Sequence, residues 1–141
     1  MKILFAADGS DHTKLAARYL VGLVHALAKP PVIHVLHVHP PIPYAGAAAA
    51  AGSDAVKRYH KEESEAALAV AEGVLRDARV EFTSSWVAGE VAAEIVGYAN
   101  REGIELIVMG SRGMGRLATL ALGSVADGVL RTTTVPVTVV K

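Results

Sequence analysis

The sequence predicts an α/β fold, in which one open parallel sheet of five strands carries helices on both of its faces. Short apolar, β-branched segments alternate with longer segments of helical periodicity along the chain. The 141 residues suffice for one domain, and neither a linker nor a second core divides them. If the chain reverses direction after two right-handed crossovers, the strand order is 3-2-1-4-5. We therefore expect residues 1–141 to form a single domain.

The first three elements are expected at residues 2–7, 11–28 and 32–38. The two outer segments are apolar and rich in β-branched residues, which favours strands. In the middle segment apolar side chains recur at three- and four-residue spacing, which predicts an amphipathic helix. Ser10 or Asp11 can cap this helix, and a Lys-Pro-Pro sequence ends it.

A loop is expected next, at residues 40–52, followed by a long helix at residues 53–77 that Ser53 caps. Three prolines exclude regular structure at the start of the loop. The alanine tract that follows can form a helix, but glycines flank it and large apolar anchors are few, so the sequence favours a mobile loop. The loop leaves the carboxyl edge of the sheet, where it is a candidate lid.

The C-terminal half continues the alternation of strands and helices. Strands are expected at residues 80–87, 104–109 and 135–140, and helices at residues 90–101 and 124–131. The last strand lies at an edge of the predicted sheet. Because an exposed β-branched edge has unpaired backbone groups, we expect it to pair with a second copy in a homodimer.

Composition excludes several classes of function. Lys and Arg number 14, as do Asp and Glu, so the net charge is zero, which argues against nucleic-acid binding. The absence of cysteine excludes disulfides and thiolate metal sites. Apolar runs are too short for a membrane span, and an acidic residue at position 8 comes too early for a signal peptide. A cytoplasmic protein is expected.

Two segments end at the switch point of the predicted sheet, between its first and fourth strands, where open α/β sheets bind ligands. One is Asp8-Gly9-Ser10, and the other is the glycine-rich segment 109–116 with Gly123 beyond it. Glycine lets backbone N–H groups approach an anion and adopts positive φ, and a helix N-terminus supplies further donors. The pattern favours a phosphate cradle. Alternatively, these glycines only end a strand and admit a tight turn.

The spacing of the glycines distinguishes among nucleotide-binding motifs. No Gly-Lys pair exists, which excludes a P-loop. Gly110, Gly113, Gly123 and Ser124 instead fit G-x2-G-x9-G-[ST], and with this motif the whole chain resembles the universal stress protein family. The resemblance implies a Rossmann-like sheet, ATP binding and a homodimer. Mg²⁺ is a candidate ion to accompany the ATP.

The resemblance also implies roles for residues on the base and ribose side. Asp8 matches an acidic contact near the ribose and base, and Val38 matches a residue whose backbone meets the adenine. Met109 and Gly110 match positions beside the ribose. Ala6 stands where some ATP-binding members have proline. From the residues alone, Asp8 can instead cap the first helix or form a local turn.

On the phosphate side, Gly113 and Gly123 match positions beside the phosphates, and Ser124 with the Val125 amide matches the terminal-phosphate contacts. Ser124 and an Asp three residues later also resemble a helix capping box. Arg112 and Arg116 can reach phosphates or be ordinary surface arginines.

Three histidines in and after the second strand, His34, His37 and His39, suggest a metal site. His37 and His39 share one strand face, but without a nearby carboxylate in the sequence plain packing is the favoured interpretation. We expect no metal site there.

Three functions remain open. The favoured one is a small ATP-binding regulator or sensor in the stress response. The second is a slow ATPase or phosphotransferase that uses the same pocket, although the sequence shows neither a lysine clamp nor a general base. The third is a nucleotide-free interaction module, against which the intact glycine motif argues.

Overall fold

The computed structural model describes residues 1–41, 46, 49–50, 52–115 and 122–141. Most of the expected loop at 40–52, with its lid role, lies outside these residues, as does Arg116. Of the described part of that loop, Gly46, Ala49 and Ala50 are helical. The sequence favoured a loop there, and the high helix propensity of alanine accounts for the difference.

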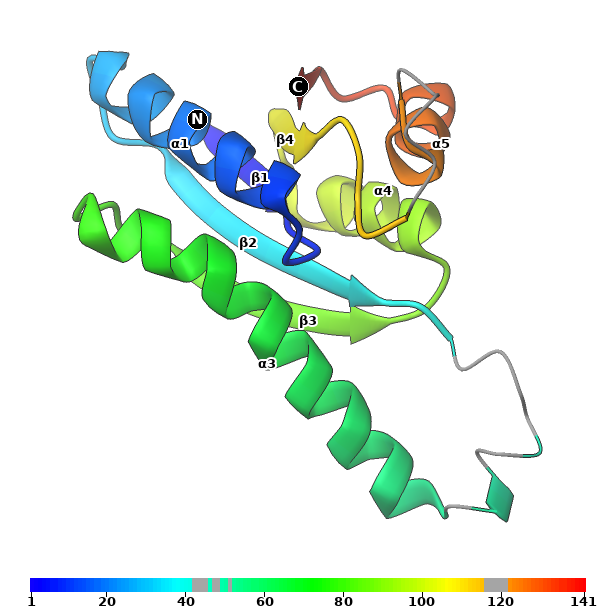
Figure 1. The fold of residues 1–141 in the computed structure, drawn as a ribbon. Coiled ribbons are helices and arrows are strands. Elements are labelled where there is room, and N and C mark those ends of the chain that lie inside the picture. Colours follow the sequence, from blue (N-terminus) through cyan, green and yellow to red (C-terminus); the bar gives the residue numbers. More distant parts are fainter. Residues whose placement is uncertain (42–45, 47–48, 51, 116–121) are drawn as a thin grey trace.

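Five parallel strands form one open sheet in the order β3-β2-β1-β4-β5, which confirms the predicted fold class. The elements in chain order are β1 (Lys2–Ala6), α1 (Asp11–Ala26), β2 (Val32–His39), α3 (Ser53–Asp77), β3 (Thr83–Ala88), α4 (Val91–Glu102), β4 (Leu106–Gly110), α5 (Ser124–Thr132) and β5 (Val137–Val140). Figure 1 shows that strands β2 and β3 end at the same edge of the sheet.

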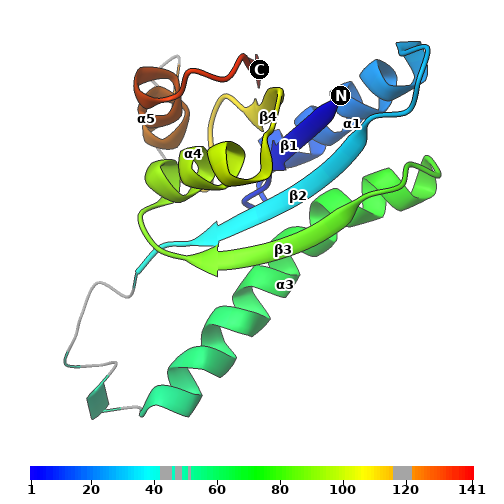
Figure 2. The same ribbon diagram turned by 180° about the vertical axis from the view of Figure 1, so that it is seen from behind.

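Helices cover both faces of the sheet. Helices α1 and α3 lie on one face, and α4 and α5 lie on the other, as Figure 2 shows from behind. Each face has its own buried apolar cluster. Phe5, Leu20 and Leu75 belong to the cluster beneath α1 and α3, and Leu4 and Ile95 belong to the other. Consecutive residues of β1, Leu4 and Phe5, therefore pack into opposite layers, and this alternation fixes the strand register.

Three strands begin later than predicted because the preceding residues bond elsewhere. The amide of Val80 donates to Leu75 O and so belongs to the end of α3. The amide of Ile104 likewise donates to Ala99 O in α4. The amide of Val135 donates to Thr133 Oγ1. Apolar composition marks these residues as core but does not reveal a helix-terminal hydrogen bond.

Helix caps agree with the sequence in one case and differ in another. Ser10 caps α1, because its hydroxyl accepts from the amide of Thr13. Ser53 is not a cap: the N-cap of α3 is Gly52, with φ 83°, and it makes no side-chain cap bond. A positive φ favours glycine over serine at that position.

Candidate functional site

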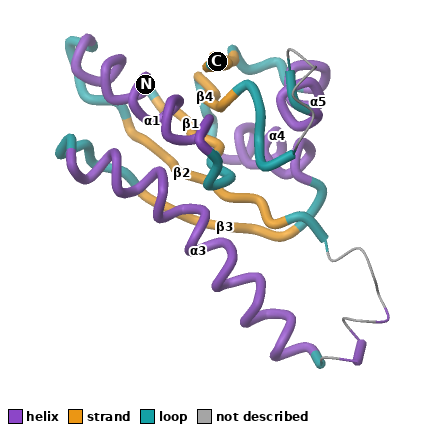
Figure 3. The backbone as a smooth tube through the Cα atoms, in the orientation of Figure 1, coloured by secondary structure: helices purple, strands orange, loops and turns teal. Residues whose placement is uncertain are grey.

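A cavity of about 740 Å³ opens at the carboxyl ends of β1, β2 and β4, at the switch point of the sheet. Its lining residues run from the end of β2 to the first turn of α5. Figure 3 shows where these two elements lie along the backbone. The structure brings all of the site residues predicted from the sequence to this one cavity: Asp8, Val38, Met109, Gly110, Arg112, Gly113, Gly123, Ser124 and Val125. Segments about 100 residues apart in the chain therefore meet at one site.

Asp8 is held by the turn that begins α1. Its Oδ1 accepts from the amide of Ser10 at 3.0 Å and from the hydroxyl of Thr13 at 2.8 Å. The Thr13 hydroxyl in turn accepts from the amide of Asp8 at 3.1 Å. The local turn expected as an alternative therefore forms, and it uses one carboxylate oxygen. The other, Oδ2, lies directly beside Gly113 in the cavity lining.

The glycines of the motif stand where a side chain would be crowded. A Cβ on Gly113 would collide with Asp8 Oδ2, and one on Gly110 would lie 2.8 Å from the Cβ of His12. At Gly123 a Cβ would lie 3.3 Å from the Cα of Arg112. None of the three has positive φ. Of the two properties that glycine offers, these positions therefore use close approach of neighbouring groups and not unusual backbone angles.

The N-terminus of α5 faces the cavity through Ser124 and Val125. Gly123 is the N-cap, its amide donates to Ser111 O at 2.7 Å, and no side chain caps the helix. The expected capping box is absent because Ser124 is the first helical residue and not the N-cap. Asp127 instead pairs with Arg131 at 2.8 Å. The first amides of a helix lack intrahelical partners and lie at the positive end of its dipole, so this end can bind an anion.

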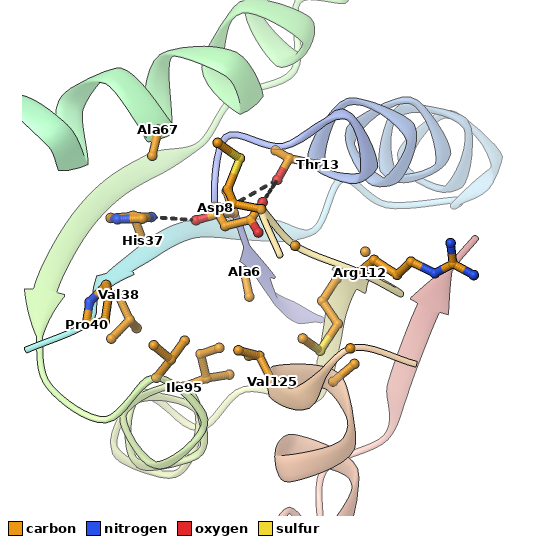
Figure 4. Close-up of a pocket in the computed structure, with 18 of the residues that line it drawn as sticks. Ala6, Asp8, Thr13, His37, Val38, Pro40, Ala67, Ile95, Arg112 and Val125 are labelled. Carbon is orange, nitrogen blue, oxygen red and sulfur yellow. Dashed lines mark hydrogen bonds between the residues drawn. The ribbon is translucent and has the colours of Figure 1, made fainter. Parts of the chain in front are cut away.

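One side of the cavity is apolar and the other is polar. Val38, Ile95 and Val125 approach it from the α4 and α5 side (Figure 4). Asp8 and His37 lie on the side of α1 and α3. A flat apolar ring with a polar edge fits such a cleft, because apolar walls hold the ring faces and a few polar groups fix its orientation.

Arg112 contributes mainly backbone to the cavity. Its guanidinium points away from the centre of the site (Figure 4). A phosphate contact through this side chain requires another rotamer, whereas its amide lies in the glycine segment itself.

The three histidines separate into two environments. Nδ1 of His34 lies 3.0 Å from the hydroxyl of Tyr98 in α4. On the other face His37 is 8% exposed, and its Nδ1 donates to Ala7 O at 2.8 Å. Burial lowers the pKa of His37 below its ordinary 6.5. No group of three or more His, Asp or Glu side chains suited to a metal ion occurs among the described residues.

Several cavity residues have no counterpart in the sequence prediction. Ile95 lines it from α4, and its signal was only a place in an apolar helical stripe. Tyr59 and Glu63 line it from α3, a helix that the sequence did not connect with the site. In the part of the chain that the structure describes, no helix is long and apolar enough to cross a membrane.

Comparisons with known proteins agree with this architecture. The family model described as the Universal stress protein family matches residues 1–141. Universal stress protein MJ0531 of Methanocaldococcus jannaschii is 32% identical over 141 residues, which cover 99% of this chain and 81% of the relative. A universal stress protein of Thermus aquaticus is 36% identical over 142 residues, covering 99% and 97% of the two chains.

A solved structure has the same fold as this chain. That of protein MJ0577, also from Methanocaldococcus jannaschii, superposes with a TM-score of 0.78 at 28% identity and covers 99% of this chain and 94% of its own. The family model, the relatives and the fold thus agree over the whole chain, and the chain belongs to the universal stress protein family.

Proposed function

We propose that the cavity binds ATP and that the protein is a small cytoplasmic regulator in the stress response whose state depends on nucleotide occupancy. The observation that carries this proposal is the meeting of three features at one site. These are the carboxylate of Asp8, the crowded glycine segment around Gly113 and the uncapped N-terminus of α5. Together they offer a ribose acceptor and an anion cradle.

We assign each part of the nucleotide a place in the cavity. The adenine lies at the end of β2, where the backbone of Val38 borders the apolar side of the cavity. The ribose lies between Asp8 and Met109, and Asp8 Oδ2 accepts from a ribose hydroxyl. The phosphates lie along Gly113 and Gly123 and end at the first amides of α5. A Mg²⁺ ion bound with ATP takes most of its ligands from phosphate and water.

Two solved structures of the same fold contain ligands that are chemically related to ATP. A universal stress protein of Archaeoglobus fulgidus was solved with dAMP at 22% identity to this chain, and another universal stress protein was solved with cAMP at 21% identity. These identities establish the shared fold, and both ligands are adenine nucleotides. The choice among them for this chain is therefore a question for direct titration.

Calorimetric titration of the purified protein with ATP, ADP, AMP, cAMP and GTP tests the proposal. We expect micromolar-range binding of ATP with one site per chain and weaker binding of AMP, because AMP lacks the phosphates that the α5 amides bind. We also expect GTP to bind more weakly than ATP. Equal affinity for ATP and AMP would show that the terminal phosphates do not contact the glycine segment. If none of the five nucleotides binds, the proposal is rejected.

Hydrolysis of ATP is expected to be feeble, well below the ~1 s⁻¹ low end of typical enzyme turnover. Phosphoryl transfer needs a positioned Mg²⁺ and a group that orients the nucleophile. The carboxylate nearest the glycine segment, Asp8, is occupied through Oδ1 by Ser10 and Thr13. Steady-state phosphate release with Mg²⁺ measures the rate. Several turnovers per second that vanish in Asp8→Ala would place the protein among enzymes instead.

The proposal includes a homodimer formed through β5. This strand lies at the edge of the sheet and pairs with β4 on its inner side. The carbonyls of Pro136 and Val140 accept from β4 and the residue after it, so by the alternation of a strand the backbone groups of Val137 and Val139 point outward. A second copy that pairs with those groups removes an exposed sheet edge.

A further inference from the structure

The first part of α3 projects beyond the carboxyl ends of β2 and β3 (Figure 1). The first buried residue of the helix is Ser64, and the next is Leu68. Within residues 53–63, which we call the projecting segment, only Val56 and His60 are even partly buried. The contacts that hold this segment against the rest of the molecule are therefore few.

A cluster of four rings joins the projecting segment to the end of β2. It comprises His37 and His39 from β2 and Tyr59 and His60 from α3, and we call it the histidine cluster. His39 lies at its centre, with ring centroids 4.3 Å from His60, 5.6 Å from Tyr59 and 6.3 Å from His37. Three of its members, His37, His39 and Tyr59, also line the cavity.

Backbone carbonyls fix the tautomers of the two strand histidines. Nδ1 of His37 donates to Ala7 O at 2.8 Å, and Nδ1 of His39 donates to Pro40 O at 2.7 Å. A carbonyl oxygen only accepts, so each Nδ1 carries a hydrogen and each Nε2 carries the lone pair. A further proton on either ring therefore goes to Nε2.

The helix side of the cluster holds polar atoms without partners. Nε2 of His60 and, one turn later, Oγ of Ser64 are both buried and make no hydrogen bond with the described residues. A proton added at Nε2 of His60 thus creates a charged donor with no acceptor, which is more costly than the neutral ring. Protonation of His60 at this atom therefore weakens the contact.

On balance, the surroundings of the cluster lower the pKa values of His37 and His60. Burial, followed by repulsion from His39, lowers the pKa of His37, although the bond to Ala7 O and the carboxylates of Asp8 and Glu63 oppose this. Desolvation and His39 lower the pKa of His60. On the outer side β3 pairs Trp86 and Ala88 with the strand histidines and supplies no charge. On α3 the charged neighbours one turn from His60 are Lys57 and Glu63.

We propose that the histidine cluster is a proton-sensitive latch that holds the projecting segment of α3 against the end of β2 and releases it when His37 and His60 become charged. Histidines whose pKa is lower in the closed form than the ordinary 6.5 stabilise closure fully above pH 6.5. That stabilisation is lost as the pH falls from 6.5 through the lowered pKa. Release moves Tyr59 and Glu63 away from the cavity wall. The latch does not depend on which ligand the cavity takes.

Hydrogen exchange of the ligand-free protein tests the latch. Exchange in peptides that cover residues 56–64 is compared at about pH 7.5 and pH 5.5, after correction for the intrinsic rate at each pH. We expect corrected protection to fall several-fold at the lower pH in the parent protein. His60→Phe keeps an aromatic ring that cannot be protonated, so its protection should change little with pH. His25→Gln, an exposed change in the last turn of α1, should behave as the parent does.

A histidine NMR titration of the parent accompanies the exchange experiment, and the His37 and His60 rings should titrate below pH 6.5. The latch is rejected if the corrected protection of residues 56–64 is the same at both pH values. A segment that shows no protection at either pH also rejects it. It is also rejected if His60→Phe loses protection at the lower pH as much as the parent does. Failure of ATP to bind leaves these outcomes unchanged, so the two proposals fail separately.

Discussion

Gly113→Val is expected to weaken ATP binding at least about a hundredfold, which corresponds to about 2.8 kcal/mol. Even a Cβ at this position collides with Asp8 Oδ2, and the two further methyl groups extend the obstruction into the space that we assign to the phosphates. Gly123→Val should have a similar effect, because its Cβ would lie 3.3 Å from the Cα of Arg112 and 3.4 Å from the carbonyl oxygen of Ser111. Calorimetric titration measures both.

Gly22→Val is the matched control for these variants. It makes the same substitution at an exposed position of α1 where a Cβ meets nothing within 4 Å. Valine has a higher helix propensity than glycine, so the control should fold normally and bind ATP as the parent does. Circular dichroism melts establish that all variants are folded. If folded Gly113→Val binds ATP with the affinity of the parent, the phosphates do not lie at the glycine segment.

Val139→Pro is expected to convert the dimer into a folded monomer. Proline removes the outward N–H of Val139, which a partner strand needs, while the inner bonds to β4 come from alternate residues. Lysine substitutions on β5 are less suitable, because Val137 and Val139 pack partly against the core beneath α4 and α5.

Val139→Thr is the control for the proline variant, since threonine is β-branched, similar in size and retains the N–H. Light scattering coupled to gel filtration should give a dimer for the parent and for Val139→Thr, and a monomer for Val139→Pro. A parent that is monomeric, or a folded Val139→Pro that remains dimeric, contradicts an interface built on the β5 edge.

The sequence was sufficient to predict the sheet order, because alternating apolar and helical segments leave few right-handed topologies. It was also sufficient to bring Asp8, Gly113 and Gly123 to one cavity, since the carboxyl ends of neighbouring strands must meet. It misplaced the first residues of β3 because Val80 is apolar yet donates its amide to the end of α3. Hydrophobicity reports burial and does not report the hydrogen-bond partner.

The histidine cluster could not be predicted from the sequence, for a different reason. His37 and His39 were recognised on one strand face, but His60 is about 20 residues away, in a basic segment that has the composition of a solvated helix face. Its contact with His39 depends on how far α3 extends past the end of β2. That distance follows from the packing of Leu68 and Leu75 into the core and not from any local pattern.

Native mass spectrometry tests most directly whether the switch-point cavity holds ATP, as we propose. The protein is measured as purified and again after incubation with excess ATP and Mg²⁺, with Gly113→Val treated in the same way. We predict an added mass of one ATP per chain in the parent and none in Gly113→Val. A parent that stays at the mass of the free chain at every ATP concentration up to millimolar, or a Gly113→Val that loads equally, would contradict it.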